Sequence, residues 1–120
     1  MSDSAPSESG IRYVDGVMII EPPNELMDRL DIVNIGDVWL KAIESERPTR
    51  VIMNFDRVSF FGSEAIGVVI RMTKRIRTYG GDIKLCSMGK MIREIFDICQ
   101  LIPALFEVYD STADAIASFE

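Results

Sequence analysis

The feature that most constrains the fold is a regular alternation of short β-prone runs with longer segments that carry a helical pattern. Residues 51–55 (VIMNF) are the best candidate for a central strand. A helical pattern follows from Ser63 to about Thr78, and a Gly-Gly pair ends it. Strands that alternate with helices of this length indicate a parallel or mixed sheet, and right-handed crossovers place successive helices on a common side of it. The sequence therefore predicts a small α/β domain with its helices packed mainly on one side.

The other expected elements continue this alternation. In chain order they are strands at 11–14 and 17–20 around an Asp15-Gly16 turn, a helix from Leu30 that Pro48 breaks, a strand at 82–87, a helix at 88–100, a strand at 105–109 and a terminal helix. Residues 25–29 are compatible with either a loop or a short helical turn. Asp31 is the expected N-cap of the first helix, and Ser111 begins a capping box for the last one.

The same periodicity predicts which side chains face inward. Phe55 lies on the central strand, and Val69 and Ile95 lie on the apolar faces of two helices. We expect a truncation of any of the three to alanine to destabilise the domain by roughly 2–5 kcal/mol.

Length and composition limit the chain to one domain. It has 120 residues, of which 48% are hydrophobic, and this is enough for a single compact core. Residues 1–10 are polar and acidic without the features of a secretory signal, so we expect a disordered tail and then one domain at 11–120. No apolar run approaches the roughly 20 residues that span a bilayer. We therefore expect a cytoplasmic protein without membrane insertion.

Few residues are available for an active site. The chain has no histidine, and its two cysteines, Cys86 and Cys99, form no CxxC pair and are expected to be buried. No phosphate-binding glycine loop, dinucleotide fingerprint or nucleophile elbow occurs. We therefore expect no catalytic residues, no metal and no cofactor, and we predict that the protein is not an enzyme. The formal net charge of −6 argues against direct binding of nucleic acid, because phosphate contacts dominate that affinity.

One basic cluster, RMTKRIR at residues 71–77, lies on the helical pattern that starts at Ser63. Arg71, Lys74 and Arg75 share one helical face, and apolar side chains share another. A solvated face whose cations complement the C-terminus of the helix is the favoured interpretation. A surface for an anionic partner, such as an acidic protein, is the alternative.

The junction between the central strand and the next helix, VSFFGSEAIG at residues 58–67, places one serine at the start of a helix. Ser63 is expected at the N-cap, where its hydroxyl can accept a hydrogen bond from a backbone N–H of the first turn. Glu64 would then be a first-turn anion that the helix dipole favours. These structural roles account for both residues without any function.

The order and spacing of these segments resemble a STAS domain. A strand, then VSFFGSEAIGVVI, a basic helix, GGDIKLCSM and finally IREIFDICQLIPALFEVYDS follow one another in the order typical of that family, from about Ile11 to Phe119. The type that the chain resembles is the anti-sigma factor antagonist, a small bacterial regulatory protein. The resemblance implies a STAS-like fold and a regulator of transcription. Such a protein binds an anti-sigma factor, a related serine kinase or another protein partner.

The resemblance also assigns roles to four residues. The family's loop before the second helix usually reads Asp-Ser-Ser/Thr-Gly, and residues 62–65 (GSEA) fill these positions here. Phosphorylation in the family falls on the first serine, which matches Ser63, and an acidic residue at the start of the first helix matches Asp31. The partner-binding residues implied are Asp31, Gly62, Ser63 and Glu64.

Two positions depart from the family's pattern. Gly62 stands in place of the aspartate, and Glu64 stands in place of the second hydroxyl residue. Both positions contribute to the surface that a serine kinase would recognise. A STAS scaffold or transporter-associated subunit that is not phosphorylated is therefore the alternative function.

Overall fold

The computed structural model describes residues 10–22, 29–59, 61–102 and 105–119, apart from the side chains of residues 29–31. Residues 1–9 of the predicted tail lie outside this description. Residues 25–28, which the sequence left open between a loop and a helical turn, also lie outside it.

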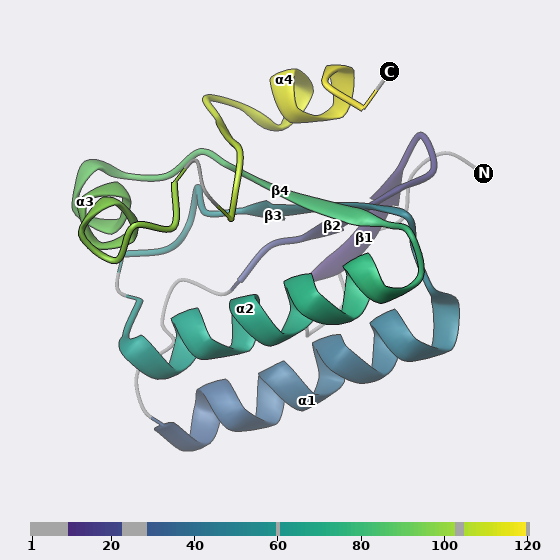
Figure 1. Cartoon of the computed structure of the whole chain (residues 1–120), viewed down its shortest axis with the longest axis horizontal. Helices are drawn as coiled ribbons and strands as arrows, with labels where there is room; N and C mark the ends of the chain where they lie inside the picture. The colour runs from purple at the N-terminus through teal and green to yellow at the C-terminus, as the bar shows by residue number, and fades with distance from the viewer. Residues whose placement is uncertain (1–9, 23–28, 60, 103–104, 120) are drawn as a thin grey trace.

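A single mixed sheet organises the domain (Figure 1). The elements in chain order are β1 (Ile11–Val14), β2 (Val17–Ile20), α1 (Arg29–Glu46), β3 (Arg50–Asn54), α2 (Ser63–Thr78), β4 (Asp82–Cys86), α3 (Lys90–Ile98), β5 (Val108–Tyr109) and α4 (Thr112–Ala117). The strands lie in the order β1-β2-β3-β4-β5, with β1 antiparallel to β2 and the other neighbours parallel. The predicted α/β class with a mixed sheet is confirmed.

The central strands are buried on both faces. Helices α1 and α2 lie side by side on one face of the sheet, α4 covers part of the other face, and α3 lies at one end (Figure 1). Along β3, Val51 and Met53 belong to the core shared with α1 and α2, whereas Ile52 belongs to a smaller cluster with Cys86 and Ala115. Continuous apolar runs are typical of strands covered on both sides. The helices therefore lie mainly on one side, as predicted, with the short α4 on the other.

The first hairpin forms at the predicted turn. Asp15 and Gly16 have φ values of 51° and 79°, the left-handed conformations that a two-residue turn needs to match the twist of its strands. The pairing begins at Gly10, whose carbonyl accepts a hydrogen bond from the Glu21 backbone N–H at 2.8 Å. A Cβ on Gly10 would lie 2.0 Å from the Glu21 carbonyl oxygen. Glycine is required there because the two chain segments approach so closely.

Helix α1 starts earlier than expected. Its first residue is Arg29, so Asp31 is the third residue of the helix, and the prediction that Asp31 is the N-cap is wrong. The first side chain of α1 that the structure describes is Ile32, which is buried, and apolar periodicity indicates the body of a helix without fixing its first residue.

The C-terminal elements are shorter than expected. Helix α3 covers Lys90–Ile98 rather than residues 88–100. Strand β5 keeps two residues, because the backbone N–H groups of Leu105 and Phe106 both donate to the Leu101 carbonyl at 2.9 and 3.0 Å and make a turn. The predicted cap of α4 is confirmed, since the Ser111 hydroxyl accepts from the Asp114 backbone N–H at 3.1 Å.

The predicted inward positions are right for Phe55, which directly follows β3 rather than lying on it, and for Val69 on α2, but wrong for Ile95 on α3. Phe55 and Val69 are 1% and 0% exposed, whereas Ile95 is 36% exposed. Helix α3 instead buries Ile92 and Phe96, which lie one turn apart. One of the two cysteines also differs from expectation, because Cys99, which follows α3, is exposed.

A cluster of aromatic rings explains which face of α3 turns inward. The ring centroid of Phe96 lies 6.0 Å from that of Phe55, 6.2 Å from that of Phe61 and 5.8 Å from that of Phe106. Edge-to-face and offset pairs at such distances add to the free energy gained by burial. A ring at position 96 therefore fixes α3 against the end of β3 and the segment before β5.

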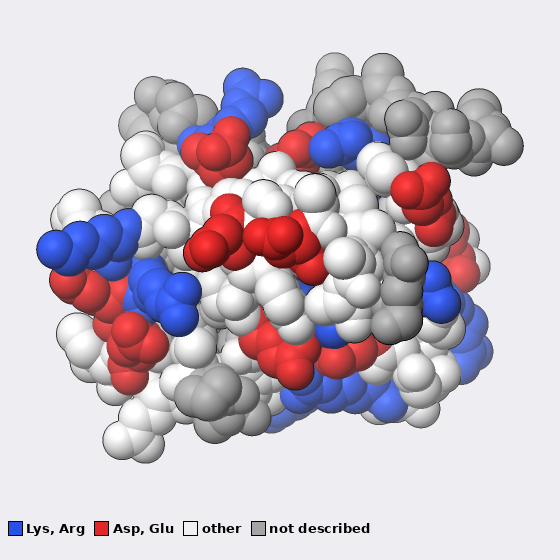
Figure 2. Space-filling model, turned by 90° about the horizontal axis from the view of Figure 1, so that it is seen from above, with Lys and Arg blue, Asp and Glu red and all other residues white. Residues whose placement is uncertain are grey.

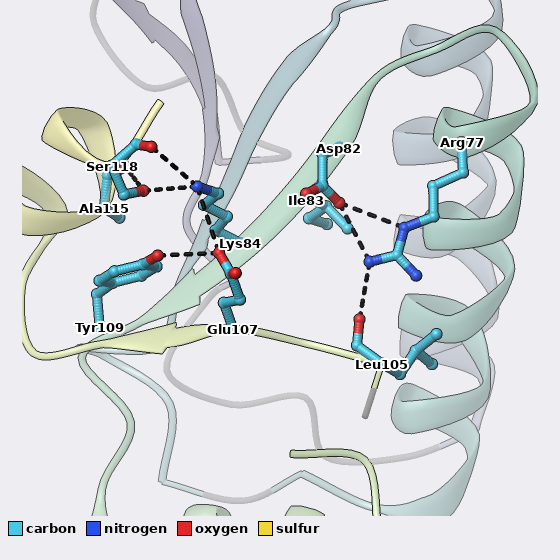
Figure 3. Close-up of polar contacts among 9 residues, drawn as sticks. All are labelled: Arg77, Asp82, Ile83, Lys84, Leu105, Glu107, Tyr109, Ala115 and Ser118. Carbon is cyan, nitrogen blue, oxygen red and sulfur yellow. Dashed lines mark hydrogen bonds and ion pairs between the residues drawn. The ribbon is translucent and has the colours of Figure 1, made fainter. Parts of the chain in front are cut away.

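Lys84 attaches α4 to the sheet (Figure 3). Its side chain projects from β4 on the α4 side, and the residue is only 8% exposed. Its Nζ donates to the Ser118 hydroxyl at 2.8 Å and the Ser118 carbonyl at 3.2 Å, and it forms an ion pair with Glu107 at 3.3 Å. It also lies 4.4 Å from the ring centroid of Phe119. The Lys84 ammonium group thus contacts both the segment that precedes α4 and the segment that follows it.

A second polar contact fixes the chain before β5. The Arg77 guanidinium, near the C-terminus of α2, pairs with Asp82 at 3.1 Å and donates to the Leu105 carbonyl at 2.8 Å (Figure 3). Asp82 also accepts from the Ile83 backbone N–H at 2.9 Å. Arg77 therefore has a structural role, which differs from the solvated face of Arg71, Lys74 and Arg75 that the sequence predicts.

We expect Phe96→Ala to lower the free energy of unfolding by about 3–5 kcal/mol, because it removes a buried ring and leaves a cavity between three others. Ile95→Ala should cost less than about 1 kcal/mol, because its side chain is already partly solvated. Urea denaturation measures both changes in the free energy of unfolding, and Ile95→Ala is the matched control for Phe96→Ala. Equal shifts of the two urea midpoints would contradict the assigned face of α3.

We expect Lys84→Ala to loosen α4 and so expose Cys86, which is buried with its Sγ 3.5 Å from the Thr112 hydroxyl at the start of α4. Burial raises the pKa of the Cys86 thiol and slows its reaction further in the closed form. In a Cys99→Ser background, Lys84→Ala should raise the rate of thiol labelling by about tenfold or more, since hydrogen bonds to a charged group contribute about 1.5–3 kcal/mol.

Lys90→Ala, which removes an exposed lysine at the start of α3, is the control and should leave the labelling rate unchanged. An unchanged rate in Lys84→Ala would mean that apolar contacts alone hold α4 in place.

Candidate functional site at the start of helix α2

The loop that follows β3 leads to the start of α2 at one end of the domain. The first turns of α1 and α2 and the whole of α3 lie at this end, on the left in Figure 1. In open α/β sheets, the segments that follow the carboxyl ends of parallel strands are the usual place for binding sites. The four residues singled out in the sequence belong to this end of the chain's fold.

Polar side chains fix the beginning of the loop. The Asn54 amide donates to Glu21 Oε2 at 3.0 Å, and its oxygen accepts from the Asp56 backbone N–H at 3.0 Å. The other oxygen of Glu21 pairs with Arg12 Nε at 3.0 Å. These residues were not among the predicted site residues, although a polar Asn54 at the end of an apolar run, followed by an aspartate, is a signal for such a turn. The network ties the loop to the ends of β1 and β2.

The underside of the loop is apolar, and its outer side is polar. Phe55, Val58 and Phe61 are buried, and the rings of Phe55 and Phe61 meet edge to face at 5.0 Å. Asp56 and Ser59 are exposed and line a shallow hollow on the outer side. These buried apolar side chains therefore hold the loop against the core. Ser63 follows at the start of α2.

Ser63 is the first helical residue of α2, and its side chain is exposed. The N-cap is Gly62, with an extended backbone (φ −82°, ψ 177°) and no side-chain cap hydrogen bond, so the prediction that Ser63 caps the helix is wrong. The Gly62 carbonyl accepts from the Ile66 backbone N–H at 3.1 Å and so closes the first turn. Ser63 therefore presents its hydroxyl to solvent beside backbone N–H groups that have no intrahelical acceptor.

Of the two predicted acidic positions, one follows Ser63 along the chain and the other lies in the first turn of the neighbouring helix. Glu64 is exposed in the first turn of α2. Asp31 lies in the first turn of α1, where the structure describes its backbone only. The two helices run side by side from the same end of the domain, and a Cβ on Gly36 of α1 would lie 3.1 Å from both terminal methyl groups of Val68 on α2. The two helices thus pack closely near the second turn of each.

Among residues 10–22, 29–59, 61–102 and 105–119, no three His, Cys, Asp or Glu side chains are grouped so that they could hold a metal ion. Within the same described ranges, no helix combines the length and the apolar character that a membrane span requires. Among the described side chains, the site offers the exposed hydroxyl of Ser63, a helix N-terminus and the adjacent carboxylate of Glu64.

Comparisons with known proteins show to which family the chain belongs. The chain matches the STAS domain family over residues 11–115. The anti-sigma factor antagonist BtrV of Bordetella bronchiseptica is 30% identical over 71 residues, which cover 59% of this chain and 60% of BtrV. The anti-sigma F factor antagonist of Paenibacillus polymyxa is 23% identical over 106 residues, which cover 88% of each protein. The chain thus spans less than two thirds of BtrV and most of the second relative.

Solved structures share the fold. The anti-sigma factor antagonist SpoIIAA in its unphosphorylated form superposes with a TM-score of 0.75 at 24% identity, covering 86% of this chain and 87% of SpoIIAA. A sulfate transporter family protein from Wolinella succinogenes superposes with a TM-score of 0.73 at 18% identity, covering 97% and 94% of the two chains. At these identities the superpositions establish the fold alone. Because the family match extends from β1 into α4, the chain belongs to the STAS domain family.

Proposed function

We propose that this protein is a bacterial, cytoplasmic anti-sigma factor antagonist that binds an anti-sigma factor with serine kinase activity and is switched by phosphorylation of Ser63. The binding surface in this proposal is the end of the domain where α1 and α2 begin. It includes Asp31, Gly62, Ser63 and Glu64. The protein acts on transcription through this binding and catalyses no reaction of its own.

The observation that carries the proposal is the exposed Ser63 in the first turn of α2, at the position that matches the phosphorylated serine of the family. The similar protein SpoIIAA has been solved in both unphosphorylated and phosphorylated forms. A kinase can reach a hydroxyl in this place without opening the fold, because no buried contact has to break.

The fold can accept a phosphate on Ser63. A phosphate adds a charge of about −1.5 to −2, and the first-turn N–H groups and the helix dipole both favour negative charge at this end of α2. Glu64 adds a carboxylate to the same turn, and its negative charge offsets part of the favourable interaction between the phosphate and the helix N-terminus. We therefore expect the phosphorylated domain to keep its structure and a similar stability.

The switch acts at the interface instead. A partner that covers the start of α2 must remove water from the phosphate, and Asp31 on the neighbouring helix adds a like charge to the same surface. Such a buried, uncompensated charge costs on the order of 2–5 kcal/mol, and each 1.4 kcal/mol changes the affinity about tenfold. Phosphorylation would then release the partner without a rearrangement of the domain.

The surface charge supports a protein, rather than a nucleic acid, as the direct partner. On the α4 side, acidic side chains occupy the middle of the face, and basic ones lie mainly around it (Figure 2). Glu107, Asp110 and Asp114 are exposed next to or on α4. Carboxylates in this arrangement repel a phosphate backbone.

We expect Ser63→Asp to weaken binding of the partner anti-sigma kinase about tenfold or more, as measured by titration calorimetry. A carboxylate in the first turn suits the helix dipole, so the variant should fold normally. Ser63→Asn, which has a similar shape without the charge, is the matched control and should bind within about threefold of wild type. Equal affinities for wild type, Ser63→Asn and Ser63→Asp would remove the switch from the proposal.

Ser63→Ala should keep the partner, resist phosphorylation by the kinase in intact-mass measurements and change the free energy of unfolding by less than about 0.5 kcal/mol, because Ser63 is not the helix cap. A loss of about 1–2 kcal/mol, typical of a missing N-cap, would contradict the position assigned to this side chain.

Asp31→Asn tests the origin of the penalty. If repulsion between Asp31 and the charge at position 63 weakens the complex, Asp31→Asn should restore part of the affinity that Ser63→Asp loses, and a double-mutant cycle should give a coupling energy of about 0.5 kcal/mol or more. Additive effects of the two substitutions would assign the penalty to desolvation or to acidic groups of the partner.

A STAS scaffold or transporter-associated subunit that is not phosphorylated is the second candidate function. The replacement of the family's aspartate by Gly62 and of its second hydroxyl by Glu64 favours it, and so does the shared fold of the sulfate transporter family protein. A pull-down from the native cytosol separates the two. An anti-sigma kinase among the captured proteins supports the first function, and a transporter subunit or other STAS proteins without a kinase support the second.

A further inference from the structure

A small cavity of about 90 Å³ lies between the C-terminal ends of α1 and α2. Its lining residues are Glu44, Arg47, Arg75, Thr78 and Tyr79. These helix ends lie on the right in Figure 1, opposite the end where α2 begins. With a rise of about 1.5 Å per residue, α2 separates the cavity from Ser63 by roughly 22 Å. The cavity is therefore distinct from the proposed partner surface.

Arg47 is held in place by the residues around it. It follows the last residue of α1 in a left-handed conformation (φ 48°), and its backbone N–H donates to the Ile43 carbonyl at 2.8 Å. Its guanidinium carbon lies 5.0 Å from the ring centroid of Tyr79. The Tyr79 hydroxyl in turn donates to the Pro48 carbonyl at 2.8 Å. A guanidinium stacked on an anchored ring loses little freedom when its N–H groups bind a ligand.

Arg75 approaches the same cavity from α2. Its Nε pairs with Glu44 Oε1 at 3.2 Å, and both side chains are 54% exposed. Burial raises the pKa of Tyr79, and the charges of Arg47 and Arg75 both act in the opposite direction, which agrees with two cations next to one ring. Two guanidinium groups and the Thr78 side chain thus surround a space that contains a single carboxylate, Glu44.

The net positive charge and the number of donors favour an oxyanion with several oxygens. The two arginines outweigh Glu44 by one positive charge, and guanidinium groups offer paired N–H donors that match the oxygens of a phosphate. A carboxylate has two oxygens, and Glu44 already supplies such a group to Arg75, whereas a phosphate monoester has three terminal oxygens that can accept from both guanidinium groups and from Thr78. We propose that the cavity between the ends of α1 and α2 binds the phosphate group of a small molecule through Arg47 and Arg75.

The test uses the full chain and inorganic phosphate, with NMR signals of the Thr78 and Tyr79 backbone amides as reporters. Phosphate added at constant ionic strength and mildly alkaline pH should produce saturable shifts with a dissociation constant on the order of millimolar, because exposed ion pairs are individually weak. Phenyl phosphate in place of phosphate distinguishes a monoester from the free ion. Acetate is the carboxylate control, and saturation by acetate at the same concentrations would overturn the assignment to phosphate.

Four variants locate the site. Arg47→Ala and Arg75→Ala should each weaken binding about fivefold or more, and Glu44→Gln should strengthen it about threefold, because it removes the competing carboxylate. Lys74→Ala is the matched control, since it removes the same charge from an exposed position next to Arg75 that does not line the cavity. It should change the affinity less than about twofold.

Circular dichroism confirms that each variant is folded, and Ser63→Ala should bind phosphate like the wild type. No saturable shift in the wild-type protein would overturn the proposal. An equal loss in Lys74→Ala and Arg75→Ala would also overturn it, because the attraction would then come from the whole basic helix. Neither result depends on whether the protein binds an anti-sigma factor.

Discussion

The burial of β3 on both faces is the constraint on which the rest of the domain depends. The strand pairs in parallel with β2 and β4, and its alternate side chains belong to the core under α1 and α2 and to the cluster under α4. A strand in this position must be apolar along its buried length, so polar groups can appear only where it ends. Asn54 marks that end, and the loop that presents Ser63 begins there.

The sequence predicted most of the fold because local patterns determine it. The β-prone run at residues 51–55 indicates a strand, and the Gly-Gly pair after α2 indicates the end of a helix, and both signals come from neighbouring residues alone. The face of α3 could not be predicted in this way, since apolar residues occur on several sides of that helix. Phe96 rather than Ile95 turns inward because three rings from distant segments leave a space of that shape.

The sequence predicted where the candidate site lies along the chain, but not which residue caps α2 or which contacts support the loop. Family resemblance located residues 62–64, but a glycine and a serine in succession both suit an N-cap, and the backbone of Gly62 takes that role. The supporting contacts depend on register. Ile20 pairs with Met53, and this pairing brings Glu21 beside Asn54, far apart in the sequence. The arginine-lined cavity likewise joins the ends of two helices, and no local pattern connects Arg47 with Arg75.

The contact between Gly36 and Val68 has a consequence for the electrostatics of the proposed interface. Gly36 lies about two turns into α1 and Val68 about one and a half turns into α2, and the helices can approach this closely only because position 36 has no side chain. Repulsion between charges grows as their separation falls, and little screening occurs once a partner excludes water. A glycine beneath the surface therefore sets how closely α1 and α2 approach each other, and with it the strength of the repulsion on which the proposed switch would depend.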